Sequence, residues 1–121
     1  MEKIKTLLEP YIDLPLECDG LTKVLSHILT KNDIEHIVHE GFLTGPRDGI
    51  WHTWIELPNG YYVDYRARMW QGESRIIPHG IFRPQLFTAV TYSINETMLL
   101  SVPDTIFEIL TFKPPAHEHF N

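Results

Sequence analysis

Residues 50–66 have the sequence IWHTWIELPNGYYVDYR, and this stretch decides the fold. Two runs of β-branched and aromatic residues flank Pro-Asn-Gly at 58–60, a pattern typical of a β-hairpin. Proline suits the first turn position because its φ is fixed, asparagine tolerates the second, and glycine supplies the positive φ that the third requires. The turn chemistry therefore predicts a three-residue loop in which Leu57 lies opposite Tyr61.

The length of this loop decides which side chains share a face of the hairpin, because side chains alternate along a strand. A two-residue loop would pair Pro58 with Tyr61 and direct His52 and Asp64 to opposite faces. The three-residue loop places Asp64 opposite Trp54 and diagonal to His52, on one face. Diagonal neighbours have Cβ atoms roughly 7–8 Å apart, so a hydrogen bond between imidazole and carboxylate is feasible.

In this register the hairpin has one face that carries the polar groups and another that resembles a core face. The first face carries His52, Trp54, Glu56, Tyr62, Asp64 and Arg66. The second carries Trp51, Thr53, Ile55, Leu57, Tyr61, Val63 and Tyr65. We expect the second face to pack against the rest of the protein.

Two helices are predicted before the hairpin. Residues 2–11 form a short one that ends near Pro10 and the Asp-Leu-Pro at 13–15. The second begins around Cys18 and continues to about residue 31, because its apolar residues follow the spacing of one buried stripe. That stripe consists of Leu21, Val24, Leu25, Ile28 and Leu29. Cys18 lies three residues before Leu21 and extends the stripe to the first helical turn.

Strand-like segments are also found at residues 35–43 and 86–93. The polar stretch between the hairpin and residue 86, with Pro78, Gly80 and Pro84, is interpreted as a loop over one face. Residues 105–112 suit either a short capped helix or a last strand.

Length and charge limit the class of protein. A chain of 121 residues is expected to form a single domain, residues 1–121. The net charge of −6, without a run of Lys or Arg, disfavours nucleic acid and anionic membranes as partners. The sequence contains neither an apolar stretch of membrane-spanning length nor a signal-peptide pattern, so we expect a cytoplasmic protein. Its single cysteine is a free thiol, which suits a reducing compartment.

Cys18, His52 and Asp64 follow one another in an order that can form a nucleophilic triad. A thiol needs a base to take its proton, and the base needs a carboxylate to hold its tautomer. Each residue also has a structural interpretation. Cys18 can be a small core residue, His52 a hydrogen-bonded strand residue, and Asp64 a partner for a nearby arginine.

These residues and their contexts resemble the transglutaminase-like cysteine-enzyme superfamily, a papain-like group. The matching segments are Glu-Cys-Asp-Gly-Leu at 17–21, Ile-Trp-His-Thr-Trp-Ile-Glu at 50–56 and Tyr-Tyr-Val-Asp-Tyr at 61–65. The resemblance implies an α+β fold with a papain/transglutaminase-like core, in which N-terminal helices pack on a small antiparallel sheet. It also implies thiol chemistry on an amide or ester carbonyl.

We therefore expect a cysteine peptidase or amidase that acts on a peptide or protein substrate without a cofactor. Cys18 would attack the carbonyl, His52 would transfer protons, and Asp64 would orient His52. The start of the helix and a charged His52 would stabilise the thiolate, and backbone N–H groups there would bind the oxyanion. Asp19 would oppose the thiolate if it pointed inward, so we expect it to point outward.

Two alternatives remain open at this point. The same chemistry with an amine acceptor would make the protein an acyltransferase or transglutaminase. A domain that keeps the fold without a working site would be a partner-binding module. Substrate identity and oligomeric state are left open by the sequence.

Further residues are candidates for binding. Trp54, Arg66 and Trp70 are predicted to contact the substrate, although Trp54 and Trp70 can equally serve packing. No metal site is predicted, because the histidines lack an accompanying cluster of carboxylates or thiols at a metal-binding spacing. His36, His39, His117 and His119 are instead interpreted as surface histidines.

Overall fold

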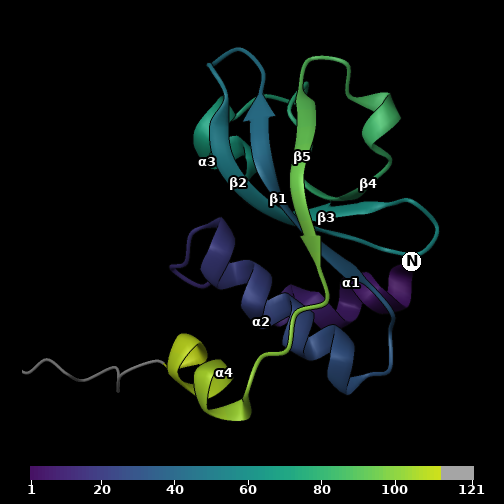
Figure 1. The fold of residues 1–121 in the computed structure, drawn as a ribbon, viewed down its shortest axis with the longest axis vertical. Coiled ribbons are helices and arrows are strands. Elements are labelled where there is room, and N and C mark those ends of the chain that lie inside the picture. The colour runs from purple at the N-terminus through teal and green to yellow at the C-terminus, as the bar shows by residue number, and fades with distance from the viewer. Residues whose placement is uncertain (113–121) are drawn as a thin grey trace, which may run out of the picture.

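The computed structural model describes residues 1–112 and has an α+β architecture (Figure 1). Within these residues, one antiparallel sheet has the strand order β4-β3-β2-β1-β5. The helices are α1 (Glu2–Leu8), α2 (Cys18–Lys31), α3 (Ala67–Gln71) and α4 (Asp104–Thr111), with 3₁₀ turns at Glu9–Tyr11 and Pro84–Leu86. The strands are β1 (Ile37–Thr44), β2 (Ile50–Glu56), β3 (Tyr62–Asp64), β4 (Gly80–Phe82) and β5 (Thr91–Met98).

The hairpin between β2 and β3 has the predicted three-residue turn. Leu57 N–H donates to the Tyr61 carbonyl at 2.9 Å, and Gly60 N–H donates to the Leu57 carbonyl at 2.9 Å. Gly60 has a φ of 87°, in the left-handed region that glycine adopts without a Cβ penalty. The pairing of Ile55 with Val63 confirms the register that puts His52 and Asp64 on one face.

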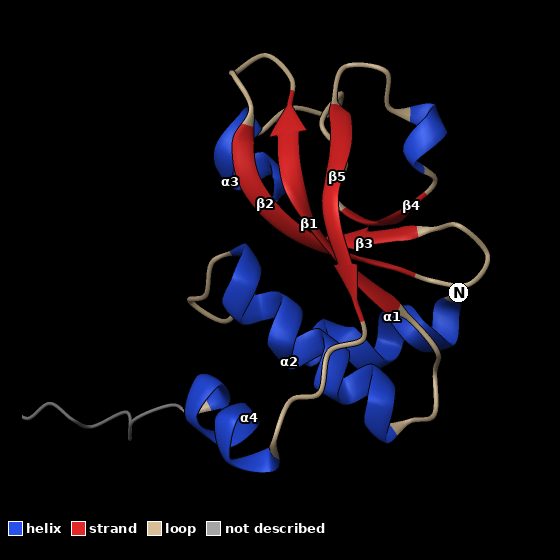
Figure 2. Ribbon diagram, in the orientation of Figure 1, coloured by secondary structure: helices blue, strands red, loops and turns tan. Residues whose placement is uncertain are grey.

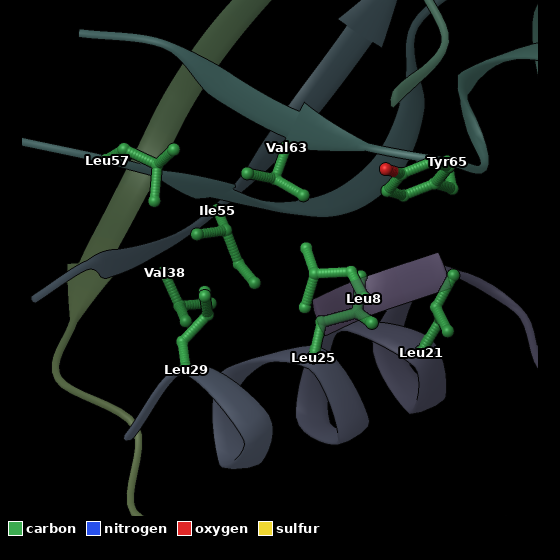
Figure 3. Packing of buried hydrophobic residues seen from close by; sticks show 9 residues of the cluster. All are labelled: Leu8, Leu21, Leu25, Leu29, Val38, Ile55, Leu57, Val63 and Tyr65. Atoms are coloured by element: carbon green, nitrogen blue, oxygen red, sulfur yellow. The ribbon is translucent and has the colours of Figure 1, made fainter. Parts of the chain in front are cut away.

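The main core lies between α2 and the second face of the hairpin (Figure 3). Leu21, Leu25 and Leu29 come from the apolar stripe of α2, and α1 adds Leu8. The strands contribute Val38, Ile55, Leu57, Val63 and Tyr65 to the same cluster. Burying each of these aliphatic side chains is worth roughly 1.5–3 kcal/mol. The helices α1 and α2 thus cover one face of the sheet, as expected for the coarse α+β class (Figure 2).

The other face of the sheet is covered by aromatic side chains, because the sheet curls until β5 approaches β2 and β3. The ring of Tyr92 on β5 lies 4.8 Å from that of Trp54 and 5.2 Å from that of Tyr62. Phe82 of β4 lies 6.1 Å from Tyr92. Aromatic pairs at such spacings add to the stability gained from burial.

The interpretation of the segment between the hairpin and β5 was wrong in part. It contains the short helix α3 and the three-residue strand β4 in addition to loops. The last strand also begins later than predicted, at Thr91, because residues 84–86 form a 3₁₀ turn with proline at its start. Residues 105–112 adopt the helical alternative, since α4 ends at Thr111. No helix among residues 1–112 is long and apolar enough to cross a membrane.

Gly41 allows β5 to approach β1 closely. The pairing of these strands shifts between Glu40 and Gly41, which marks a β-bulge. A Cβ added to Gly41 would lie 1.9 Å from the Ser93 carbonyl oxygen. Only glycine fits there, because the backbone itself occupies the space that a side chain would need.

We expect Gly41→Ala to destabilise the protein more than Gly60→Ala. Gly41→Ala forces β5 away from β1 and should lower the free energy of unfolding by about 3 kcal/mol. A Cβ at Gly60 meets no atom within 4 Å, so only the left-handed backbone opposes it, at a cost of about 1–2 kcal/mol. Urea denaturation of both variants measures the difference. Equal losses would contradict the close packing at Gly41.

Candidate active site

Cys18 is the first residue of α2 and is buried. Its neighbours Glu17 and Asp19 are exposed, so this helix start lies at the protein surface. The carboxylate of Asp19 accepts the backbone N–H of Gly20 at 2.8 Å and thus points away from the interior, as predicted. The thiol is therefore shielded while the backbone around it reaches solvent.

His52 and Asp64 form a buried hydrogen-bonded pair across β2 and β3. His52 Nε2 donates to Asp64 Oδ2 at 2.7 Å, and the two side chains are 0% and 2% exposed. This is the contact that the hairpin register made feasible. The bond fixes the orientation of the imidazole ring in the same way as a carboxylate orients a general base.

The start of α2 approaches His52 at an open edge of β2. Within the described residues, β3 pairs with β2 only at Ile55 and Glu56, which leaves the β3 side of His52 without a strand partner. One turn into α2, Thr22 Oγ1 donates to the Thr53 carbonyl at 3.4 Å. The helix thus docks beside the open part of β2.

The thiol of Cys18 lies close enough to His52 to raise the pKa of its imidazole. His52 Nε2 is engaged with Asp64, whereas Nδ1 is buried and has no hydrogen-bond partner among residues 1–112. Nδ1 is therefore the ring nitrogen that remains for the thiol. An unpaired buried nitrogen is costly in a purely structural setting, and it is what a general base needs.

The charge state of His52 follows from two opposing effects. Burial alone would lower the pKa of His52, because it disfavours the charged ring. The charge and hydrogen bond of Asp64, together with the smaller effect of Cys18, outweigh burial and raise the pKa of His52 from 6.5 to about 10. The pair with Asp64 thus favours the charged, imidazolium form of the ring.

Tyr92 is a member of this site that sequence reasoning missed. Its hydroxyl donates to Asp64 Oδ2 at 2.8 Å, and the Arg66 backbone N–H donates to Asp64 Oδ1 at 2.9 Å. Burial and the charge of Asp64 raise the pKa of Tyr92 well above its usual value, so the phenol stays a donor. The sequence gives no signal for this contact, because it depends on how far the sheet curls.

Arg66 holds the chain segment before Cys18 through its guanidinium group. Its Nε donates to the Leu16 carbonyl at 2.6 Å, and Nη2 donates to the Leu14 carbonyl at 2.8 Å. Nη1 donates to the carbonyl of Tyr65 at 3.0 Å. All three guanidinium nitrogens are thus bonded to backbone, and a substrate contact of Arg66 stays a prediction.

The two tryptophans predicted to bind substrate have different positions. Trp54 is 0% exposed and packs among the aromatic side chains, and its contact with substrate stays a prediction. Trp70 lies partly buried on α3, and its carbonyl accepts a hydrogen bond from Arg47 at 3.0 Å. A substrate contact of Trp70 stays a prediction.

A pocket of about 320 Å³ lies beside the segment that leads into Cys18. Its lining includes Glu17, Tyr65, Arg66, Arg68, Met69 and His79. A larger hollow of about 770 Å³ lies at the opposite end of α2, next to Thr30, Ile34 and Leu99. The smaller pocket is lined by Glu17, the residue directly before Cys18.

The histidines outside the site do not form a metal centre in the described part of the chain. Among residues 1–112, no three His, Cys, Asp or Glu side chains are grouped to hold a metal ion. The surface interpretation of His39 was wrong, since it is 3% exposed and its ring contacts Glu56 at 2.6 Å. His36 is partly buried and accepts a hydrogen bond from Ser26 at 2.6 Å. His117 and His119 lie outside the described residues.

The fold and site define an α+β protein in which a cysteine at a helix start adjoins a buried His–Asp pair. No family model matches the chain, and neither a curated protein nor a solved structure matches it.

Removal of the Tyr92 hydroxyl should lower the stability of the protein, because Asp64 loses a hydrogen bond. We expect Tyr92→Phe to lower the free energy of unfolding by about 1.5–3 kcal/mol, the range for a hydrogen bond to a charged group. Tyr61→Phe is the matched control, because its hydroxyl only accepts a bond from Arg83 at the surface. Chemical denaturation measures both variants, and equal effects would argue against a bond between Tyr92 and Asp64.

The raised pKa of His52 predicts a pH-dependent stability. Folding raises this pKa, so the stabilisation is complete below the unfolded value of 6.5 and is lost as pH rises toward 10. The free energy of unfolding should therefore fall by a few kcal/mol over this interval in the unmodified protein. His52→Gln should lose this part of the slope, and His36→Gln, which removes a histidine bonded to Ser26 beyond the far end of β2, should keep it. Identical slopes in all three proteins would exclude the raised pKa.

Proposed function

We propose that the protein is a cysteine hydrolase that cleaves an amide bond of a peptide or protein. Cys18 is the nucleophile, His52 the general base and acid, and Asp64 the residue that orients His52. His52 carries this proposal, because its Nε2 is bonded to Asp64 at 2.7 Å while its Nδ1 is left without a partner beside the cysteine. The fold alone can be stable without that arrangement.

The reaction follows from these positions in two stages. In the resting pair the thiol proton is already on His52 Nδ1, and the Cys18 thiolate Sγ forms a bond with the carbonyl carbon of the substrate, whose oxygen takes up the negative charge. The carbon–nitrogen bond then breaks, and His52 gives the proton to the leaving amine. A thioester remains on Cys18. Water loses a proton to His52 and attacks the thioester, so the acid product leaves and the thiol is restored.

The resting state of this site favours the first stage. An imidazolium with a pKa of about 10 stabilises a neighbouring thiolate by direct charge interaction. The N-terminal end of α2 adds the positive end of the helix dipole at the same place. The proton transfer from thiol to imidazole is thus supported before the substrate arrives.

The backbone at the start of α2 suits the oxyanion of the tetrahedral intermediate. Glu17 occupies the N-cap position, and its side chain makes no capping hydrogen bond. Among residues 1–112, no backbone or side-chain acceptor engages the N–H groups of Cys18 and Asp19. Helix starts normally satisfy such groups with a capping side chain. Here they are free to bind a developing negative charge.

Alkylation of the single cysteine tests the thiolate–imidazolium pair. We expect iodoacetamide to label Cys18 at pH 6 nearly as fast as at pH 8, because His52 keeps the thiolate charged. In His52→Gln, the rate should fall about tenfold per pH unit below the ordinary thiol range near 8.5. Intact mass measures the rates, and Cys18→Ser gives the unlabelled control.

His36→Gln serves as the matched histidine control, because His36 precedes β1 and bonds to Ser26, and it should label like the unmodified protein. Unfolding curves identify any variant that loses its structure. A rate that falls steeply below pH 8 in the unmodified protein, as in His52→Gln, would reject the proposed function and leave a folded binding domain.

A further inference from the structure

Phe42 and Trp51 form an exposed aromatic pair on neighbouring strands. They lie opposite each other in the register of β1 and β2, with ring centroids 5.2 Å apart in an edge-to-face arrangement. Phe42 is 45% exposed and Trp51 is 48% exposed. Single exposed apolar residues are common, but two aromatic rings in edge-to-face contact form a surface that can bind an apolar group.

The register of β2 places this pair beside the start of α2. Ile55 packs in the same cluster as Leu25, and Thr53 accepts a hydrogen bond from Thr22. The next residue of β2 on this face is Trp51, because side chains alternate along the strand. One helical turn before Thr22 is Cys18. From the contact between Thr22 and Thr53, the next position along β2 is thus Trp51 and the next turn of α2 is Cys18. The aromatic pair and the thiol therefore lie at neighbouring positions of the packed helix and strand.

Chain connectivity ties the pair to the other reactive group as well. Trp51 directly precedes His52, whose ring is buried on the opposite face of the strand. The carboxylates of Glu17 and Asp19 are exposed on either side of Cys18, so acidic residues of a substrate are disfavoured there.

We propose that Phe42 and Trp51 bind an aromatic or large aliphatic side chain of the peptide substrate, next to the bond that Cys18 attacks. This inference rests on the proposed function, since it names the substrate class of that site. The occupant is an uncharged apolar residue of an extended peptide. The curvature of the sheet leaves the two rings open at the surface, where such a side chain can cover them.

The test compares two chloromethyl ketones that alkylate Cys18 with loss of chloride, one derived from N-acetyl-phenylalanine and one from N-acetyl-glycine. Each rate is divided by the rate with free N-acetylcysteine, which removes intrinsic reactivity. We expect a preference of about tenfold or more for the phenylalanine reagent, as one apolar group in a binding site provides. Phe42→Ala and Trp51→Ala should each reduce the preference, and the double variant should bring it to within about threefold of unity.

Leu99→Ala is the matched control, because it removes an exposed apolar side chain at the far end of α2 and should keep the full preference. Iodoacetamide, which has no side chain to bind, should label all these variants equally. A preference near unity in the unmodified protein, or one that survives in the double variant, would overturn the subsite while the iodoacetamide result stands. Slow labelling by iodoacetamide that does not depend on His52 would overturn the proposed function and the subsite together.

Discussion

A single turn conformation sets the arrangement on which the site depends. The glycine at position 60 takes a φ of 87°, and the resulting three-residue loop fixes the register between β2 and β3. A slip of one residue would move every side chain of β3 to the other face. His52 and Asp64 would then lie on opposite faces of the sheet, and Val63 would leave the core beneath α2. The hydrophobic packing and the polar pair therefore depend on the same register, so the burial of the core also stabilises the geometry of the site.

The ion pair between His52 and Asp64 needs further hydrogen bonds because it lies in the protein interior. Removing an ion pair from water costs several kcal/mol per ion unless further hydrogen bonds satisfy the remaining atoms. Asp64 receives them from His52, from the Tyr92 hydroxyl and from the Arg66 backbone N–H. Arg66 in turn bonds to the carbonyls of the segment before Cys18. The carboxylate is thus connected to the helix start through one arginine, which joins the position of Cys18 to that of His52.

The sequence predicts well those elements whose conformation is determined by residues close together in the chain. The stripe of α2 and the turn at 58–60 each carry their own periodicity or backbone preference, so their residues indicated the helix and the hairpin register directly. The strand β4 has three residues, too few for any periodicity, and β5 is an exposed edge strand with a largely polar sequence. The role of Tyr92 depends on sheet curvature, and the guanidinium bonds of Arg66 depend on a loop docked from far along the chain. Neither contact has a local pattern.

Several features of the site reduce the stability of the fold and persist nevertheless. A buried imidazolium, a ring nitrogen without a partner and a helix start without a side-chain cap each carry a cost that an apolar replacement or a serine cap would remove. All three occur within one cluster formed by Cys18, His52 and Asp64. Unfavourable local choices of this kind concentrate at functional sites, where they serve charge stabilisation or proton transfer. Under the proposed function, a thiol beside the free nitrogen and the uncapped helix start would give each of these costs a chemical use.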